Sequence, residues 1–372
     1  MGQGDPFDRH QHRLTPVPSG DFFMRAAITG PATWRGPEIK DSKAWVYEFT
    51  PAEIDEIDAA LRNVRARGKL ISTMTREDFP LPTVSKVIAH TREQIENGLG
   101  LQLLRGIQAE RYSKDDLRII YWGVGQHMGT AVSQSAKGDI LGDVRNLGID
   151  INSPQGRGYT SNQKLTYHTD SCDVVALFVL RTARSGGLSM IASSQAIHNE
   201  ILKQRPDLLE VLYQPFYWSW QGQEEPGQPP YYQQPVFSMH DGKFSCRYVR
   251  THIRSAQRFP DVPRLTPIQE EALDFLDSLS GSTDFHFSMM FQPGDLQFLN
   301  NHMMLHSRTA FEDFEEPEKK RHLLRMWLSV PNSRALSPAL GTIYRDQRAG
   351  AVRGGFPSRT GKLIYETVGS IE

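Results

Sequence analysis

The chain has little cysteine, little net charge and no long apolar run. Its 372 residues include only two cysteines, Cys172 and Cys246, which form neither a CxxC pair nor a disulfide framework, so a reducing compartment is expected. Lys and Arg (42) nearly balance Asp and Glu (43), which argues against a nucleic-acid or membrane surface. The apolar run from Val174 to Leu180 is far shorter than the roughly 20 residues of a membrane span. These absences predict a cytoplasmic protein, and they leave open whether it forms a homo-oligomer.

Two regions of different character follow one another along the chain. Residues 1 to about 45 are rich in Gly, Pro and polar residues, and we expect a polar N-terminal arm followed by a single domain over 46–372. Capping residues and apolar periodicity predict helices after Thr50, over 82–100 and after Ser113. From about residue 140, short strand-like runs alternate with turn signals, and helices over 193–209 and after Thr266 interrupt them. This order favours a mainly β fold with α, an antiparallel sandwich or jelly roll with N-terminal helices and helical insertions.

The stretch "LTYHTDSCDVVALF" contains a histidine and an aspartate two residues apart. In a strand, residues i and i+2 point to the same face, so His168 and Asp170 would project together and offer two ligands to a divalent metal. A strand end at the surface that carries two polar residues is the alternative, and the pair alone does not exclude it.

The later stretch "FQPGDLQFLNNHMMLHSRTAFED" contains two further histidines, His302 and His306. A tight turn at "PGD" leads into a strand, and "LHSR" indicates a second extended segment. Two histidines and one aspartate make the facial triad of non-haem Fe(II) oxygenases, in which open coordination positions accept oxygen and a bidentate 2-oxo acid.

A 2-oxo acid such as 2-oxoglutarate has a distal carboxylate, which a planar arginine fork neutralises best. Arg321, Leu323, Arg325 and Trp327 alternate along the last strand-like run and would share one face. Two arginines on an otherwise apolar strand are costly to bury without an anion. The alternative is that Arg321 lies in solvent at the strand end and only Arg325 is internal.

The motifs "YHTD", "SGGLS", "NNHMMLHSRTAF" and "RHLLRMWL" occur in an order that resembles the taurine dioxygenase and 2,4-dichlorophenoxyacetate dioxygenase superfamily. The stretches "YTSNQKLTYHTD" and "LHSRTAF" are also similar to γ-butyrobetaine hydroxylase. The resemblance covers about residues 100–335. It implies a double-stranded β-helix, that is, a jelly roll, and a dioxygenase that uses Fe(II), O2 and 2-oxoglutarate and releases succinate and CO2.

The resemblance assigns roles to individual residues. His168, Asp170 and His306 match the metal ligands, whereas His302 has no counterpart. Arg321 matches the arginine that pairs with the distal carboxylate of 2-oxoglutarate. The resemblance further implies that Arg325 is a second active-site arginine and that Ser189 replaces a threonine whose hydroxyl contacts the same carboxylate. Because Asp170 is retained, it favours hydroxylation or desaturation over halogenation.

The sequence says less about the substrate. Candidate walls are "YWGVGQHMG" and "SCRYVRTHI", and the residues selected from them are Tyr121, Gln126, Tyr248 and Arg250. Each of these is also compatible with a core or surface role. The favoured hypothesis is an oxygenase that acts on a small, carboxylate-bearing molecule such as an amino acid. A metal-binding jelly roll without oxygenase activity (an isomerase or a sensor) and a catalytically silent interaction protein are the rivals.

Overall fold

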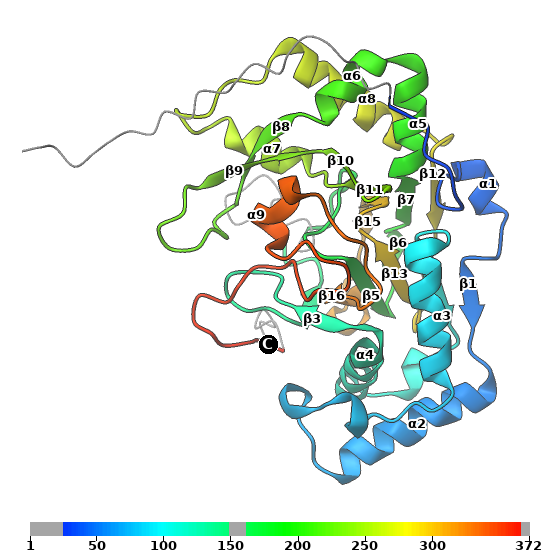
Figure 1. Ribbon diagram of the computed structural model, residues 1–372. Helices are drawn as coiled ribbons and strands as arrows, with labels where there is room; N and C mark the ends of the chain where they lie inside the picture. Colours follow the sequence, from blue (N-terminus) through cyan, green and yellow to red (C-terminus); the bar gives the residue numbers. More distant parts are fainter. Residues whose placement is uncertain (1–24, 149–160, 366–372) are drawn as a thin grey trace, which may run out of the picture.

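The computed structural model describes residues 25–148 and 161–365, and Figure 1 labels its helices and strands. The first 24 residues of the predicted N-terminal arm lie outside the described residues. The rest of that arm contributes Trp34 and Ile39 to the core. The helices are α1 (Gly36–Lys40), α2 (Pro51–Ala66), α3 (Val84–Asn97), α4 (Lys114–Met128), α5 (Ser194–Gln204), α6 (Pro206–Leu212), α7 (Arg250–Ala256), α8 (Pro267–Gly281) and α9 (Gly341–Tyr344).

The helix starts predicted after Thr50 and Ser113 are confirmed, and each has a capping box. The side chain of Thr50 accepts a hydrogen bond from the backbone N–H of Glu53, whose carboxylate accepts one from the Thr50 N–H in return. Ser113 does the same with Asp116 at the start of α4. Such reciprocal bonds satisfy N–H groups that a helix start otherwise leaves unpaired.

The larger sheet is antiparallel except at one edge, where β1 (Val46–Glu48) runs parallel to β2 (Leu101–Arg105). From β2 the order continues with β13 (Leu296–Asn300), β5 (Val174–Arg181), β16 (His322–Ser329) and β3 (Thr130–Val132), and β4 (Gly142–Val144) also pairs with β16. The smaller sheet has the order β12 (His286–Met289), β7 (Ser189–Ser193) and β14 (Met304–Arg308). Three two-stranded pairs complete the strands: β8 (Pro215–Ser219) with β9 (Tyr231–Pro235), β10 (Phe237–His240) with β11 (Lys243–Cys246), and β6 (Ser185–Gly186) with β15 (Phe311–Glu312).

The two faces of β16 have different neighbours, as the period of two in a strand requires. Leu324, Met326 and Leu328 pack in a core that they share with helices α2, α3 and α4, which Figure 1 shows grouped at one end of the molecule. The alternate residues face away from these helices. The larger sheet therefore has one face covered by helices and one face available for a site.

Three local predictions require correction. The run "KLTYHTD" is not a regular strand, because its amides have unrelated partners: His168 exchanges backbone hydrogen bonds with His306, whereas the Thr169 N–H bonds to the carbonyl of Tyr248. The helix expected over 193–209 is divided at Pro206, which begins α6. Helix α7 was not predicted. None of the helices in the described ranges is both long enough and apolar enough to cross a bilayer.

Candidate active site

A cavity of about 820 Å³ lies between the two sheets. The larger sheet supplies Val175, Leu177 and Gln297 to its wall, together with the outward face of β16, and the smaller sheet supplies Ser189 and His306. Loops and helix α7 close its remaining sides. The cavity is therefore placed where side chains of both sheets converge.

His168, Asp170 and His306 meet in this cavity. Their ligand atoms all lie within 4.8 Å of one another, and they are the group with metal-binding geometry among the described residues. His306 Nε2 is 3.7 Å from Asp170 Oδ2, and the two imidazole rings are 4.3 Å apart at their centres. The backbone pairing of His168 with His306 brings the two histidines together even though 138 positions in the chain separate them.

The three side chains are in the protonation states that a divalent metal requires. Burial lowers the pKa of His306 to about 3 and also lowers the pKa of His168, so both imidazoles are neutral. His168 Nδ1 is 2.8 Å from the carbonyl oxygen of Thr166, which leaves Nε2 for a metal. Burial alone would raise the pKa of Asp170, but the nearby guanidinium groups of Arg325 and Arg247 lower it, so this carboxyl is ionised.

The fit of a metal to these residues rests on one buried atom in particular. Asp170 Oδ2 is buried and has no hydrogen bond from any residue in the described ranges. An ionised oxygen without a partner costs several kcal/mol in an apolar setting. A cation held jointly with two neutral imidazoles removes that cost, and this donor set is the one that binds Fe(II) in facial triads.

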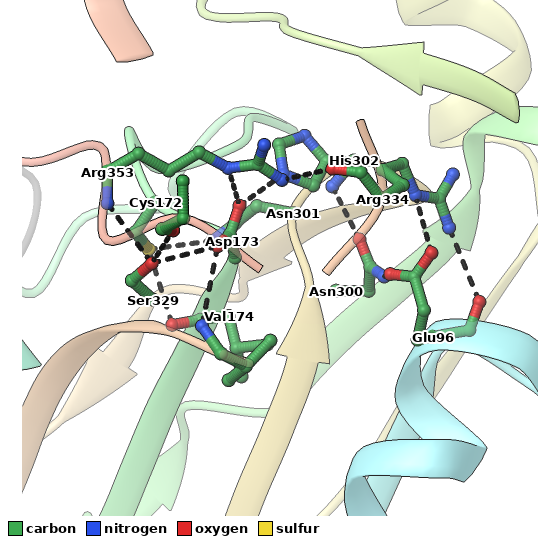
Figure 2. A network of polar contacts seen from close by, with 12 residues as sticks. Glu96, Cys172, Asp173, Val174, Asn300, Asn301, His302, Ser329, Arg334 and Arg353 are labelled. Atoms are coloured by element: carbon green, nitrogen blue, oxygen red, sulfur yellow. Dashed lines mark hydrogen bonds and ion pairs between the residues drawn. The ribbon is translucent and has the colours of Figure 1, made fainter. Parts of the chain in front are cut away.

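A network of buried polar side chains holds the loop that carries Asp170 (Figure 2). Asn301 accepts a hydrogen bond from the Asp170 N–H through Oδ1, at 3.0 Å, and donates one to Cys172 Sγ through Nδ2. Asp173 accepts from Arg353 Nε at 2.8 Å and lies 2.9 Å from His302 Nε2. His302 is therefore a buried partner of Asp173, in accordance with the prediction that His306 supplies the ligand.

Arg321 is buried in the cavity wall, with 5% of its surface exposed. Its guanidinium lies 5.0 Å from the centre of the Phe311 ring, and Nη1 has no hydrogen-bond partner within the part of the chain that the structure describes. Burial, with a contribution from Arg308, lowers its pKa to about 9. The alternative placement of Arg321 in solvent is therefore excluded. Asp313 is near enough to favour the charged form and accepts a hydrogen bond from the Arg321 backbone N–H, but Nη1 stays without a partner among the described residues, which points to an anionic ligand.

Ser189 is also buried in the cavity wall, and its hydroxyl oxygen is 3.2 Å from Gln297 Nε2, on the opposite sheet. Gly187, in the turn before it, has a φ of +72°, a conformation that suits glycine. A Cβ at Gly187 would be in ordinary contact with Arg321 Nε, at 3.4 Å, so this turn lies directly beside the guanidinium. The "SGGLS" motif thus brings a hydroxyl and an arginine to one wall.

Arg325 follows Arg321 by four residues and lies beside the metal ligands. Its Nη1 is 3.8 Å from Asp170 Oδ1, and its Nε donates to Gln134 Oε1 at 2.7 Å. It therefore connects the ligand carboxylate to the loop after β3. Arg321, Leu323, Arg325 and Trp327 all line the cavity, which confirms that they share one face.

The family model of the taurine catabolism dioxygenase TauD, TfdA family matches residues 66–327 of this chain. The chain belongs to this family. It is a non-haem Fe(II)- and 2-oxoglutarate-dependent dioxygenase, and the HxD pair with its distal histidine forms the iron site.

Individual relatives agree with the family assignment. FR-33289 synthase of Streptomyces rubellomurinus is 31% identical over 332 residues, which is 88% of this chain and 98% of that protein. An asparagine oxygenase in complex with Fe(II), hydroxyasparagine and succinate matches with a TM-score of 0.59 at 15% identity, over 83% of this chain and all of that one. The non-haem iron oxygenase OrfP, in complex with Fe and α-ketoglutaric acid, matches with a TM-score of 0.57 at 16% identity, over 76% of this chain and 93% of its own. The dioxygenase therefore shares the mixed α/β fold of these oxygenases.

The four residues selected as candidate substrate contacts do not line the cavity. Tyr121 is fully buried beneath the sheet, and its hydroxyl accepts a hydrogen bond from the Met326 N–H. Gln126 lies on the same helix, α4, on the side of the sheet away from the cavity. Tyr248 donates to Asp277, and Arg250 pairs with Asp277 and with two other carboxylates of α8. The side chains of Tyr121, Tyr248 and Arg250 therefore bind neighbouring elements of the fold.

Sequence reasoning missed several polar residues of the wall. Arg308 is two residues after His306 on β14, so the same alternation that places His306 in the cavity also predicts Arg308 there. Arg247 was considered but not selected, and it is 2% exposed. Thr251 and Ser255 line the cavity from one face of α7. They were missed because α7 is short and has no side-chain cap at its start, so the sequence did not predict this helix.

Proposed function

We propose that this dioxygenase oxidises a small, carboxylate-bearing molecule, by hydroxylation or desaturation, with release of succinate and CO2. Fe(II), when bound, supplies the activation of O2 that couples decarboxylation of 2-oxoglutarate to oxidation of the substrate. The observation that carries the cosubstrate part of the proposal is the buried Arg321 guanidinium in the cavity that the metal ligands share. A cation in this position needs an anionic partner, which the distal carboxylate of 2-oxoglutarate provides.

The chain's own residues would divide the work as follows. His168, Asp170 and His306 would hold the metal on one side and leave positions open toward the cavity. Arg321 would bind the distal carboxylate of the cosubstrate, with Ser189 donating its hydroxyl to the same group. Arg325 would face the substrate. Leu323 and Leu177 would exclude water from the space between.

We also propose that the two sheets form the double-stranded β-helix of the family and that 46–372 is one domain. The cavity between the two sheets, with ligands from each, supports this architecture. A cytoplasmic location is supported by the two cysteines, both buried and free.

Amino acids are one substrate class that the comparisons support. The solved structures of the asparagine oxygenase and of OrfP hold a hydroxylated asparagine and a hydroxylated arginine, respectively. In this chain, Arg325 and Arg247 are cations that could pair with a substrate carboxylate. An isomerase or a sensor with the same metal site would have no use for a cosubstrate carboxylate site at Arg321.

A screen for succinate release tests the proposal. The protein is loaded with Fe(II) and supplied with 2-oxoglutarate and O2, and small acids are compared with neutral compounds of the same size. We expect succinate to form in proportion to substrate with one or more acids, and not in the Asp170→Ala variant. Turnover with neutral compounds alone would overturn the assignment of an acidic substrate.

A further inference from the structure

The last part of the chain supplies one wall of the cavity. Residues 345–356, which we call the C-terminal strap, end at Phe356, whose side chain lines the cavity and is 7% exposed. The family model matches residues 66–327, so the strap lies beyond the matched residues. The three metal ligands belong to the matched part of the chain, whereas this wall of the cavity does not.

Backbone contacts on two sides hold the end of the strap. The Gly355 N–H donates to the carbonyl of Ser171, the residue that follows Asp170, at 2.6 Å. The Phe356 N–H donates to the carbonyl of Ser133, in the loop after β3, at 2.8 Å. Gly355 has a φ of +65°, and a Cβ there would collide with the Ser133 carbonyl, so glycine permits this close approach. The backbone therefore fixes the place from which the Phe356 ring projects.

Phe356 lies in the part of the cavity farthest from Arg321 along β16. Trp327 is the last residue of β16 that lines the cavity, and it pairs with Val175 of β5. The ring centres of Trp327 and Phe356 are 5.9 Å apart, and the Arg325 guanidinium carbon is 5.3 Å from the centre of the Trp327 ring. Since Arg321 would bind the cosubstrate, the end with Trp327 and Phe356 is the part left for the substrate.

This end of the cavity presents apolar surface to its occupant. Trp327, Val175 and Phe356 form a corner of two aromatic rings and one aliphatic side chain. Transfer of hydrocarbon from water to such a surface is favourable, and each buried methylene group gives about a threefold to fourfold gain in affinity. A substrate whose acidic group lies near Arg325 would have this corner beside the rest of its carbon skeleton.

We infer that Phe356 is a specificity-determining residue, which selects substrates with an aliphatic group and packs against that group in the complex. The inference rests on the proposed function and narrows its substrate class. The carbon chain of the substrate extends along Trp327 to Phe356, and small acids that lack such a chain bind weakly. The ring of Phe356 also lies 6.4 Å from that of Trp220, so the test must separate substrate selection from support of the fold.

Calorimetric titration of the anaerobic enzyme, loaded with Fe(II) and 2-oxoglutarate, tests this inference. The probes are two series that differ in their head group: butyrate, pentanoate and hexanoate, and the corresponding amides butanamide, pentanamide and hexanamide. For the wild-type enzyme we expect about threefold to fourfold tighter binding with each added methylene group in at least one series. An affinity that does not depend on chain length, or no binding of any probe, would overturn the inference.

Three variants of the strap provide the comparison. Phe356→Ala should reduce the gain to less than about 1.5-fold per methylene group, because the apolar surface that the chain covers is lost. Phe356→Leu, which keeps an apolar side chain, should retain a gain of about twofold. Val352→Ala is the matched control, since Val352 is 64% exposed and outside the cavity wall, and it should behave as the wild type does. An equal or steeper dependence in Phe356→Ala, or a lost dependence in Val352→Ala, contradicts the role of Phe356.

The cosubstrate site distinguishes substrate selection from support of the fold. Both Phe356 variants should retain the visible charge-transfer band that 2-oxoglutarate produces with Fe(II), with an unchanged Kd for 2-oxoglutarate. If both lose the band, Phe356 supports the metal site and the inference fails. If the wild-type enzyme shows the band but no preference for longer chains, the inference fails while the oxygenase assignment stands. Without the band in the wild-type enzyme, both fail.

Discussion

Replacement of Arg321 by methionine should weaken the binding of 2-oxoglutarate without lowering the stability of the folded protein. Arg321 is buried, and its Nη1 has no partner within the described part of the chain. Methionine retains much of the side-chain length and apolar volume but removes the charge. In the cosubstrate-free protein, this change removes a buried cation whose Nη1 has no hydrogen-bond partner among the described residues. We therefore expect an unfolding temperature equal to or above that of the wild type.

The affinity for 2-oxoglutarate should respond in the opposite direction. Loss of one partner of a buried, hydrogen-bonded charge pair costs about 2 to 5 kcal/mol. Since about 1.4 kcal/mol corresponds to a factor of ten, a loss of about 3 kcal/mol raises the Kd roughly 100-fold. Arg308, which remains beside Phe311, would retain part of the attraction, so the lower half of this range is expected.

Anaerobic calorimetry with Fe(II)-loaded protein measures the Kd, and thermal unfolding with and without 2-oxoglutarate measures the stability. Wild-type protein at 100 times its Kd should gain about 2.7 kcal/mol from the ligand, and the variant should gain far less at the same concentration. Arg184→Met is the control, because Arg184 is exposed and pairs with Glu312 at the surface. A Kd within threefold of wild type for Arg321→Met would refute the role of Arg321.

The remaining predictions concern the ligands, the sheet and the pH dependence. His306→Gln should abolish Fe(II) binding in equilibrium dialysis. His302→Gln should lower the free energy of unfolding by about 1 to 3 kcal/mol, through its hydrogen bond with Asp173, yet retain the metal. Loss of metal in both variants would contradict the assignment. Tyr121→Phe removes the hydroxyl that accepts a hydrogen bond from the Met326 N–H. The free energy of unfolding measured in urea should fall by about 1 to 2 kcal/mol, and KM should be unchanged. A raised KM would place Tyr121 at the substrate. Burial lowers the pKa of His198 to about 4, so below pH 6.5 the unfolded chain binds a proton that the folded protein does not. Stability should therefore fall as the pH decreases from 6.5 to 4, by at most about 3 kcal/mol for this group, and His198→Gln should have a shallower urea-midpoint profile over that interval.

Local patterns in the sequence predict those parts of the site that lie on regular elements. Alternation predicted that Arg321 and Arg325 share one face, and both line the cavity although Arg321 lies just before β16 begins. The spacing of His168 and Asp170 identified two ligands, although the segment is an irregular one that pairs with β14 only in part. The side chains of His168 and Asp170 converge without a regular strand, because backbone hydrogen bonds from His168 to His306 and from Thr169 to Tyr248 hold this segment in place.

Contacts between distant parts of the chain could not be predicted in this way. Asn301 holds the Asp170 amide across 131 positions, and Arg353 reaches Asp173 across 180. No local period encodes such pairs, because they depend on how the elements pack. For the same reason Tyr121 was selected for a pocket that lies on the other side of the sheet. Arg308, by contrast, could have been found, since it follows His306 by two residues on a strand.

The most direct test of the account is anaerobic addition of Fe(II) and 2-oxoglutarate to the purified protein, followed by visible absorption. If His168, Asp170 and His306 hold the metal and leave two positions for the cosubstrate, a weak charge-transfer band should appear. The band should be absent in His168→Ala and in Asp170→Ala. Absence of the band in the wild-type protein would contradict the central claim that this cavity binds Fe(II) and 2-oxoglutarate together.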